Sequence, residues 1–435
     1  MDPEAAYGLP MRCTRTFVRT CRLANQSPAR WQLRAPSRWR RVVVTFCAVI
    51  SLGPGSLAEQ APSPESRQEL RGVWLTSNDM PVLRDRGRMQ ATVNQLADLQ
   101  FNRLYAVVWN GGMAYYPSAV SEGRQFQNFT YRGLQGQDVI GELIAAGRSR
   151  GVAVIPWFEF GFMAPPDSEL ARRHRSWLTQ KRDGGLTSIS AAGEVVWLNP
   201  FRPEVQQLIT ELVLEVVSQY GAEGVQFDDH MSLPREFGYD SFTTALYRKE
   251  TGREPPLNPG DPAWVKWRAD RITAFMAQLA GAVRKTRPGT LISISPNYYD
   301  FAYKLQLQDW RSWVQQGIAD ELLVQIYRTD LESYLPHLTR PEVQQATSRI
   351  PTAIAVMSGQ RNRPTPLDLI RRKVEANRAQ GLGVAFFYLE SLWSLGPETE
   401  QQRISALTDI LGHGVQPAQW PSLPPLPELQ LPPAL

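Results

Sequence analysis

The chain has 435 residues, with 47 lysines and arginines, 42 aspartates and glutamates, and three cysteines. Hydrophobic residues make up 43% of the chain and aromatic residues 10%, which suffices for a large core and excludes a chain that is disordered throughout. The cysteines all lie within residues 1–58, so a disulfide scaffold and a cysteine-ligated metal centre are excluded for the rest of the chain.

The positive charge is concentrated in the same N-terminal segment. Residues 1–58 contain nine arginines and two acidic residues, so the remainder, with 38 basic and 40 acidic residues, is close to neutral. A basic stretch at 38–41 precedes an apolar run at 42–52, a Gly-Pro-Gly break and small residues at 56–58. This order is typical of a secretory signal and predicts export to the periplasm or the extracellular space. The apolar run is shorter than the roughly 20 residues of a membrane span, and an uncleaved N-terminal anchor is the alternative.

A Pro/Ser-rich linker at 59–68 and a proline-rich tail at 415–435 bracket the rest of the chain. Between them, short runs rich in Val, Ile and aromatic residues alternate with apolar residues at helical spacing, which predicts alternating strands and helices. The expected strands are 70–76, 103–109, 152–158, 224–227, 291–295, 321–327, 352–357 and 384–389. The expected helices are 88–99, 138–149, 203–219, 263–285, 307–316, 366–379 and 401–411.

Eight β/α units within residues 69–414 predict an α/β fold, a single (β/α)8 or TIM-type barrel that forms one catalytic domain. An open, doubly wound sheet is the alternative. Residues 76–81, after the first strand, contain no glycine-rich phosphate loop, so no nucleotide or other cofactor is predicted. The tail is expected to be extended rather than packed.

The C-terminal strand ends, where a barrel of this kind builds its active site, carry carboxylates, amides and aromatic rings. This mixture suits carbohydrates, because rings stack on sugar faces and paired carboxyl groups supply an acid and a nucleophile or base. The candidate catalytic residues are Asp228, Glu390, Glu159 and Asp229. The candidate substrate-binding residues are Trp74, Asn78, Asp79, Trp109, Trp157, His230, Asn297, Tyr299, Gln325, Tyr327 and Trp393.

Strand alternation singles out Asp228 among these candidates. In the fourth expected strand, Val225 and Phe227 share one face, while Gln226 and Asp228 share the other. Because the apolar pair is expected to face the surrounding helices, Asp228 is predicted to project toward the barrel axis. By the same alternation, the last strand places Glu390 on one face with Phe386 and Tyr388.

The other polar candidates have structural alternatives. Asp229 and Glu390 are also explained as loop caps, and Glu159 as the partner of an arginine in an ion pair. His230 beside two aspartates suggests a metal site, but a single histidine is a weak signal, so a hydrogen-bonding or substrate-contact role is favoured. No metal is predicted.

Four segments form a recognisable set: ELRGVWLT at 69–76, FNRLY at 101–105, PWFE at 156–159 and GVQFDD at 224–229. Together they resemble the glycosyl-hydrolase-like ten family, over nearly all of the chain that follows the linker. The resemblance implies an exported glycosidase with a TIM-type domain and Asp228 as a catalytic carboxylate. It also implies a cell-envelope role, since some members act on peptidoglycan glycan stripped of its peptides. This sequence has WFEFGF where the familiar members have WFNPYR, a departure that adds Glu159 and leaves the substrate open.

The sequence therefore predicts a glycoside hydrolase that acts on a cell-envelope or extracellular polysaccharide, with peptidoglycan glycan as one candidate. Asp228 is expected to be the nucleophile or base, and Glu390 or Glu159 the acid. A non-catalytic glycan-binding protein and a metal-dependent polysaccharide deacetylase, which needs an Asp/His/His set, are the alternatives. A glycan is the expected partner, nucleic acid is not, and a monomer is expected. Membrane contact is expected only through an uncleaved N-terminal segment.

Overall fold

The computed structural model of the chain describes residues 68–123, 130–134, 136–412 and 416–417. The predicted signal segment, the linker up to residue 67 and all but two residues of the proline-rich tail lie outside these ranges. Within the described residues, no helix has the length and apolarity needed to span a membrane.

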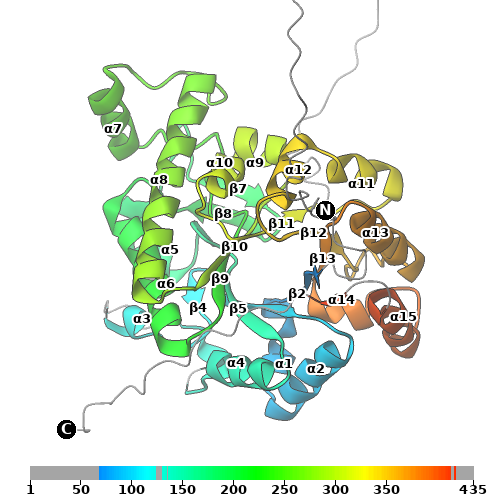
Figure 1. Cartoon of the computed structure of the whole chain (residues 1–435). Coiled ribbons are helices and arrows are strands. Elements are labelled where there is room, and N and C mark those ends of the chain that lie inside the picture. The colour runs from blue at the N-terminus through cyan, green and yellow to red at the C-terminus, as the bar shows by residue number, and fades with distance from the viewer. Residues whose placement is uncertain (1–67, 124–129, 135, 413–415, 418–435) are drawn as a thin grey trace, which may run out of the picture. The chain divides into compact units, whose positions relative to one another are not determined.

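Eight parallel strands close into a barrel, with the last strand paired to the first (Figure 1). This confirms the predicted (β/α)8 fold, and each of the eight expected runs supplies one strand. In barrel order the strands are β2 (Arg71–Leu75), β3 (Arg103–Asn110), β5 (Ala153–Phe158), β9 (Gly224–Asp228), β10 (Leu291–Ser295), β11 (Glu321–Gln325), β12 (Thr352–Met357) and β13 (Gly383–Phe387).

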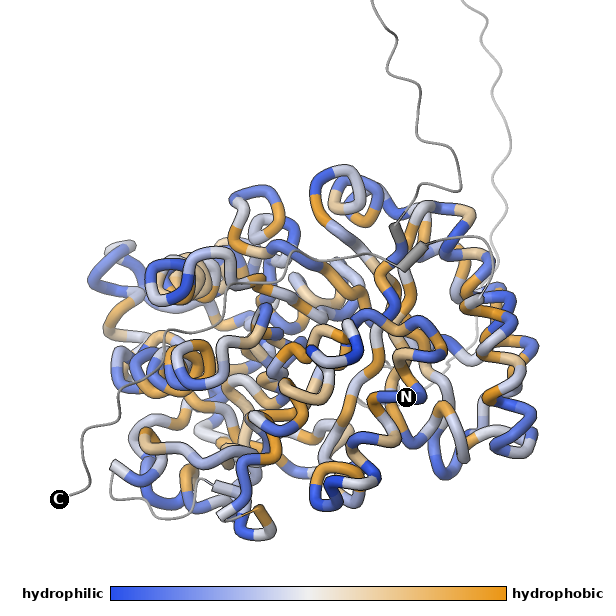
Figure 2. The backbone as a smooth tube through the Cα atoms, turned by 60° about the horizontal axis from the view of Figure 1, so that its bottom comes forward, coloured by the Kyte–Doolittle hydropathy of each residue, from blue (hydrophilic) through white to orange (hydrophobic). Residues whose placement is uncertain are grey.

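Helices connect the strands and surround the barrel (Figure 1). Along the outer helices, hydrophilic and hydrophobic residues alternate, as expected where one helix face packs on strands (Figure 2). Seven helices match the expected ones: α2 (Arg86–Asp98), α4 (Val139–Ser149), α6 (Pro203–Tyr220), α8 (Pro262–Thr286), α10 (Trp310–Gln315), α13 (Leu367–Ala379) and α15 (Glu400–Gly412). The sequence patterns did not predict α1 (Met80–Leu83), α3 (Ala119–Gly123), α5 (Glu169–Arg173), α7 (Ser241–Thr251), α9 (Tyr299–Gln306), α11 (Leu331–Leu338), α12 (Pro341–Thr347) and α14 (Leu389–Trp393).

Local signals explain several helix ends. Pro203 begins α6, where its missing N–H costs nothing, and Gly221 ends it with a left-handed φ of 59°. The expected helix at 307–316 starts later than predicted, because Leu307 has a φ of 54° and Asp309 accepts a hydrogen bond from Ser312 N as the cap of α10.

The last barrel strand, β13, ends at Phe387, two residues before the expected end at 389, so the predicted alternation does not extend to Glu390. The side chain that reaches the barrel interior is Phe387, whose ring lies 6.1 Å from Trp74 and 5.4 Å from Tyr327. Phe386 instead packs on Phe101, at a ring distance of 5.8 Å. Glu390 therefore lies on the short helix α14 rather than on a strand.

Polar side chains fill the lower part of the barrel interior. The buried Glu321 carboxylate accepts hydrogen bonds from Arg103 Nε (3.1 Å), Tyr105 OH (2.8 Å) and Ser293 Oγ (2.8 Å). These side chains come from β3, β10 and β11, so the ion pair and its hydroxyl donors join strands on opposite sides of the barrel.

A second layer lies nearer the C-terminal strand ends. Gln226 donates a hydrogen bond to Ser293 Oγ (3.0 Å) and accepts one from Trp74 Nε1 (2.7 Å). The Trp74 ring in turn lies 6.3 Å from Trp157. Gln226 faces inward, as the strand alternation predicts. The indoles of Trp74 and Trp157 lie above it and form the floor of the space at the C-terminal strand ends.

Short strands extend the loops at both ends of the barrel. After β5, an antiparallel sheet forms from β6 (Met163–Ala164), β7 (Thr187–Ser190) and β8 (Gly193–Trp197). Between β3 and α3, β4 (Met113–Ala114) pairs antiparallel with β3. At the N-terminal side, β1 (Gln68–Glu69) pairs in parallel with β14 (Gln416–Pro417). The two described residues of the proline-rich tail therefore lie beside the start of the barrel.

Replacing Glu321 with glutamine is expected to lower the free energy of unfolding by about 3 kcal/mol, because the buried Arg103 guanidinium loses its carboxylate partner. Urea denaturation would measure this change. The control is Glu254→Gln, which breaks an exposed pair with Arg248 and should cost less than about 1 kcal/mol. Equal effects of the two substitutions would contradict the structural role given to Glu321.

Candidate active site

A cavity of about 650 Å³ opens where the barrel strands end. Its wall is built by residues that follow the strands and by the tip of the β7–β8 hairpin, Ser190–Ala192. Ten of the residues predicted from the sequence line it: Asp228, Asp229, Glu159, Trp74, Asn78, Trp157, His230, Asn297, Gln325 and Tyr327.

Two predicted carboxylates do not line the cavity. The Glu390 carboxylate is bound by Arg361, at 3.1 Å, and by the Tyr388 hydroxyl, also at 3.1 Å. Asp79 is buried, with one oxygen accepting from Thr76 N (2.8 Å) and the other from Glu390 N (3.0 Å). Asp79 thus ties the loop after β2 to α14, and both carboxylates are engaged in holding the rim together.

Three predicted aromatic residues also lie outside the cavity lining. Trp109 is buried and donates its indole hydrogen to the Gly161 carbonyl (3.1 Å). The Tyr299 hydroxyl donates to Asp309 Oδ1 (2.9 Å), which fixes α9 to the start of α10. Trp393 packs against the hydrophobic core from α14. These three rings therefore contact the elements around the cavity rather than line it.

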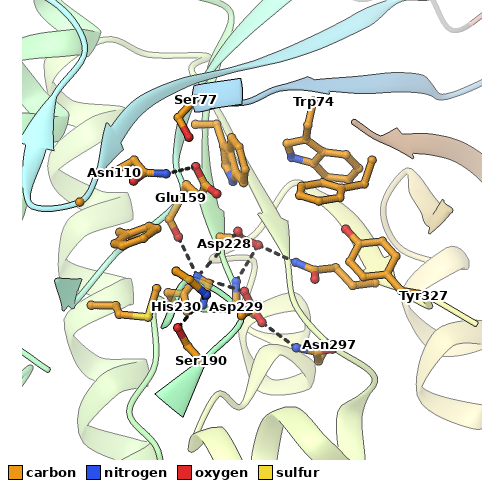
Figure 3. A pocket seen from close by; sticks show the side chains of 18 of the residues that line it. Trp74, Ser77, Asn110, Glu159, Ser190, Asp228, Asp229, His230, Asn297 and Tyr327 are labelled. Atoms are coloured by element: carbon orange, nitrogen blue, oxygen red, sulfur yellow. Dashed lines mark hydrogen bonds and ion pairs between the residues drawn. The ribbon is translucent and has the colours of Figure 1, made fainter. Parts of the chain in front are cut away.

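Asp228 is the last residue of β9, and its side chain enters the cavity as the strand alternation predicts (Figure 3). Its Oδ1 atom accepts three hydrogen bonds, from Asp229 N (2.9 Å), Ser295 Oγ (3.1 Å) and Gln325 Nε2 (2.6 Å). Gln308 Nε2 donates to the Asp228 carbonyl at 3.0 Å and holds the backbone as well. Ser295 was not among the predicted residues, although its place at the end of an inward-facing polar row is visible in the sequence.

Glu159 follows β5 and faces Asp228 across the cavity (Figure 3). Its Oε2 atom accepts a hydrogen bond of 2.5 Å from Asn110 Nδ2. Burial raises the pKa of Glu159 to about 7, the Asn110 hydrogen bond opposes this shift, and the charges of Asp229 and Asp79 add to it. Asn110 stands at the end of β3, beside the predicted Trp109, so its strand-end position is the signal that could have found it.

Asp229 and His230 follow Asp228 in the chain and line the same cavity. Asp229 Oδ2 accepts a hydrogen bond of 2.6 Å from Asn297, and its Oδ1 lies 3.3 Å from His230 Nδ1. His230 Nδ1 also lies 3.0 Å from the Glu159 carbonyl oxygen. Since a carbonyl only accepts, Nδ1 carries a hydrogen, and in the neutral imidazole the lone pair is on Nε2.

The three carboxylates affect one another's protonation. Burial, followed by the charges of Asp229 and Glu159, raises the pKa of Asp228 well above its ordinary value. Burial and the same three carboxylates also raise the pKa of the Tyr327 hydroxyl. Among the described residues that line the cavity there is no lysine or arginine. Like charges without a counter-charge therefore favour retention of a proton in this cluster near neutral pH.

One group in the described residues has the composition of a metal site. One atom each from Asp228, Asp229 and His230 lie within 4.8 Å of one another. However, Asp228 Oδ1 and Asp229 Oδ2 already accept hydrogen bonds, and His230 Nδ1 carries a hydrogen directed at an oxygen. The other two described histidines, His174 and His337, do not line the cavity, so the Asp/His/His set of a deacetylase is not assembled by the described residues.

Residues 69–374 match the family described as Glycosyl hydrolase-like 10. The chain belongs to this family. Glycosyl hydrolase DigH of Escherichia coli (strain K12) is 26% identical over 342 residues, which cover 68% of this chain and 75% of that protein. Glycosyl hydrolase YngK of Bacillus subtilis (strain 168) is 23% identical over 328 residues, which cover 66% of this chain and 60% of that protein.

Solved structures of glycosidases share the fold. The PgaB (BpsB) glycoside hydrolase domain from Bordetella bronchiseptica superposes with a TM-score of 0.58 at 15% identity, covering 79% of this chain and 99% of that one. The β-amylase catalytic domain from Paenibacillus polymyxa gives a TM-score of 0.54 at 12% identity, covering 80% and 98%. At such low identity the likeness concerns the barrel, and the family match carries the glycosyl hydrolase-like assignment.

Replacing Glu159 with glutamine is expected to stabilise the fold by about 2 kcal/mol at pH 8 and by much less near pH 4. The pKa of Glu159 is about 7 in the fold against an ordinary 4.5, so the folded protein binds this proton more tightly than the unfolded chain. The wild type therefore loses stability as pH rises through this window, and the variant does not. Urea midpoints measured from pH 4 to pH 8 would show the widening gap, whereas a constant gap would contradict it.

Proposed function

We propose that the protein is a glycoside hydrolase that cleaves a cell-envelope or extracellular polysaccharide, with Asp228 as nucleophile or base and Glu159 as general acid. The gathering of Asp228, Asp229 and Glu159 in one open cavity at the strand ends carries this proposal. Membership of a glycosyl hydrolase-like family supports it. Export is proposed only from the signal-like sequence of the N-terminal segment. Export would bring the enzyme to a polysaccharide outside the cytoplasm.

The two catalytic roles follow from the different surroundings of the carboxylates. Burial and the charges of Asp229 and Glu159 raise the pKa of Asp228, and the three donors on Oδ1 oppose this shift by stabilising the charged form that a nucleophile or base requires. The Glu159 carboxylate accepts a hydrogen bond from the Asn110 side chain, and its pKa of about 7 lets it hold a proton for the leaving group. Glu159 rather than Glu390 is proposed as the acid, because the Glu390 carboxylate does not line the cavity.

The cavity has both the apolar and the polar surfaces that sugars need. The partly exposed rings of Tyr327 and Phe387 supply apolar surface for the C–H faces of sugar rings, next to the largely buried Trp74 and Trp157. Asn297 and His230 present polar atoms for hydroxyl groups. A purely glycan-binding protein would not need carboxyl groups close to one another. Here oxygens of Asp228 and Asp229 lie within 4.8 Å, and the Glu159 charge acts on the pKa of Asp228.

The first test is incubation of the purified protein with peptidoglycan, with and without its peptides, followed by mass analysis of released fragments. Asp228→Asn and Glu159→Gln are each expected to reduce cleavage about 10²–10⁴-fold, because each removes one proton-transfer or nucleophilic group. For the wild type, kcat/KM is expected to fall as pH rises through about 7, where Glu159 loses its proton.

Glu390→Gln tests the choice of acid. This substitution removes a carboxylate that belongs to the same rim but does not line the cavity. Cleavage is therefore expected to stay within about threefold of wild type. A loss as large as that of Glu159→Gln would make Glu390 the acid instead. Near-wild-type cleavage by Asp228→Asn would remove the whole assignment.

The charge of the cavity limits which sugars can occupy it. In the part of the chain that the structure describes, three carboxylates and no lysine or arginine line the wall, so a negatively charged sugar next to the scissile bond would meet repulsion from these groups. Polymers of uronic acids are therefore expected to be cleaved at least about tenfold more slowly than the same polymers after reduction of their carboxyl groups. Equal rates, measured by the release of reducing ends, would contradict this restriction.

A further inference from the structure

The two oxygens of the Asp228 carboxylate have different surroundings. Oδ1 accepts from Asp229 N, Ser295 Oγ and Gln325 Nε2, at 2.9, 3.1 and 2.6 Å. The nearest basic atom to Oδ2 is His230 Nδ1, at 3.9 Å, which is too long for a hydrogen bond. The carboxylate is thus held through one oxygen, and the other is left to the cavity.

The two side-chain donors are themselves held rigidly. Gln325 Nε2 donates to the Ser295 carbonyl (2.7 Å) as well as to Asp228, and both partners are acceptors, which fixes the orientation of the amide. Ser295 pairs with Asp228 in the register of β10 and β9, and Gln325 is the last residue of β11. All three side chains therefore project from neighbouring strands of the barrel rather than from loops.

We propose that Gln325 and Ser295 are positioning residues, which turn Asp228 so that Oδ2 alone reacts and which stabilise its charged form. This inference rests on the proposed glycosidase function. In a retaining reaction, Oδ2 would bond to the anomeric carbon as the glycosidic bond breaks and the leaving oxygen takes the Glu159 proton. In an inverting reaction, Oδ2 would take a proton from the attacking water. In both cases Oδ1 keeps its hydrogen bonds.

The other groups around Asp228 make these donors important. Asp229 and His230 face it from the loop after β9, Glu159 from the end of β5 and the Tyr327 hydroxyl from the end of β11. Two of these groups are carboxylates, which oppose the charge on Asp228, and His230 Nδ1 is directed to the Glu159 carbonyl. Stabilisation of the Asp228 charge therefore falls mainly to the three hydrogen bonds on Oδ1.

Kinetics on a cleaved glycan provide the first measurement. Ser295→Ala and Gln325→Leu each remove one donor, so the acidic limb of the kcat/KM profile should move up by about 0.5–1 pH unit and kcat should fall about tenfold. For Ser295→Ala, KM should stay within about twofold, since Ser295 is not among the residues that line the cavity. The matched control is Ser293→Ala, the same change in the same strand, because its hydroxyl bonds Glu321 and Gln226 instead. An unmoved acidic limb in Ser295→Ala, or an equal shift in Ser293→Ala, would overturn the proposal.

Unfolding provides a measurement that does not require activity. The Ser295 donor stabilises ionised Asp228, so Ser295→Ala should lower the urea midpoint more at pH 8 than at pH 4. In an Asp228→Asn background the same substitution should lower it equally at both pH values. A pH-independent cost in both backgrounds would refute the positioning role, whereas the expected pattern in a protein that cleaves no glycan would refute the proposed function alone.

Discussion

The central physical constraint in this molecule is the placement of three carboxylates in one cavity, with no lysine or arginine among the described residues that line it. Such an arrangement is unfavourable, because each negative charge is poorly solvated and repels the other two. Neutral donors at the strand ends, chiefly Ser295, Gln325 and Asn110, partly compensate for it. A fold selected only for stability would avoid this cluster, so the cost is a reason to connect it with chemistry.

The barrel interior provides the rigidity that these donors need. The Arg103–Glu321 ion pair and its hydroxyl partners join β3, β10 and β11 below the cavity. Gln226 links this layer to Trp74, which lines the cavity. Because the contacts run from one layer to the next, the directions of the side chains at the strand ends are set by the packing beneath them as well as by the loops around them.

Residues on regular strands could be predicted from the sequence better than residues that loops bring to the cavity. Strand periodicity is a local property, so the eight barrel strands and the inward direction of Asp228 could be read from it. The alternation fails for Glu390, because β13 ends at Phe387 and a helix begins two residues later. Asn110 ends β3, so its position at a strand end was visible in the sequence although the residue was not predicted. The hairpin tip at Ser190–Ala192 reaches the cavity through loop geometry, which depends on contacts between distant segments and leaves no periodic signal.

The pairing of β1 with β14 decides which side of the barrel its attachments occupy. Gln68 and Gln416 are paired next to the start of β2, whereas the cavity opens at the C-terminal ends of the strands. The cavity therefore faces away from this strand pair. A ligand reaches the three carboxylates from the end of the barrel opposite to the one where the described chain enters and leaves it.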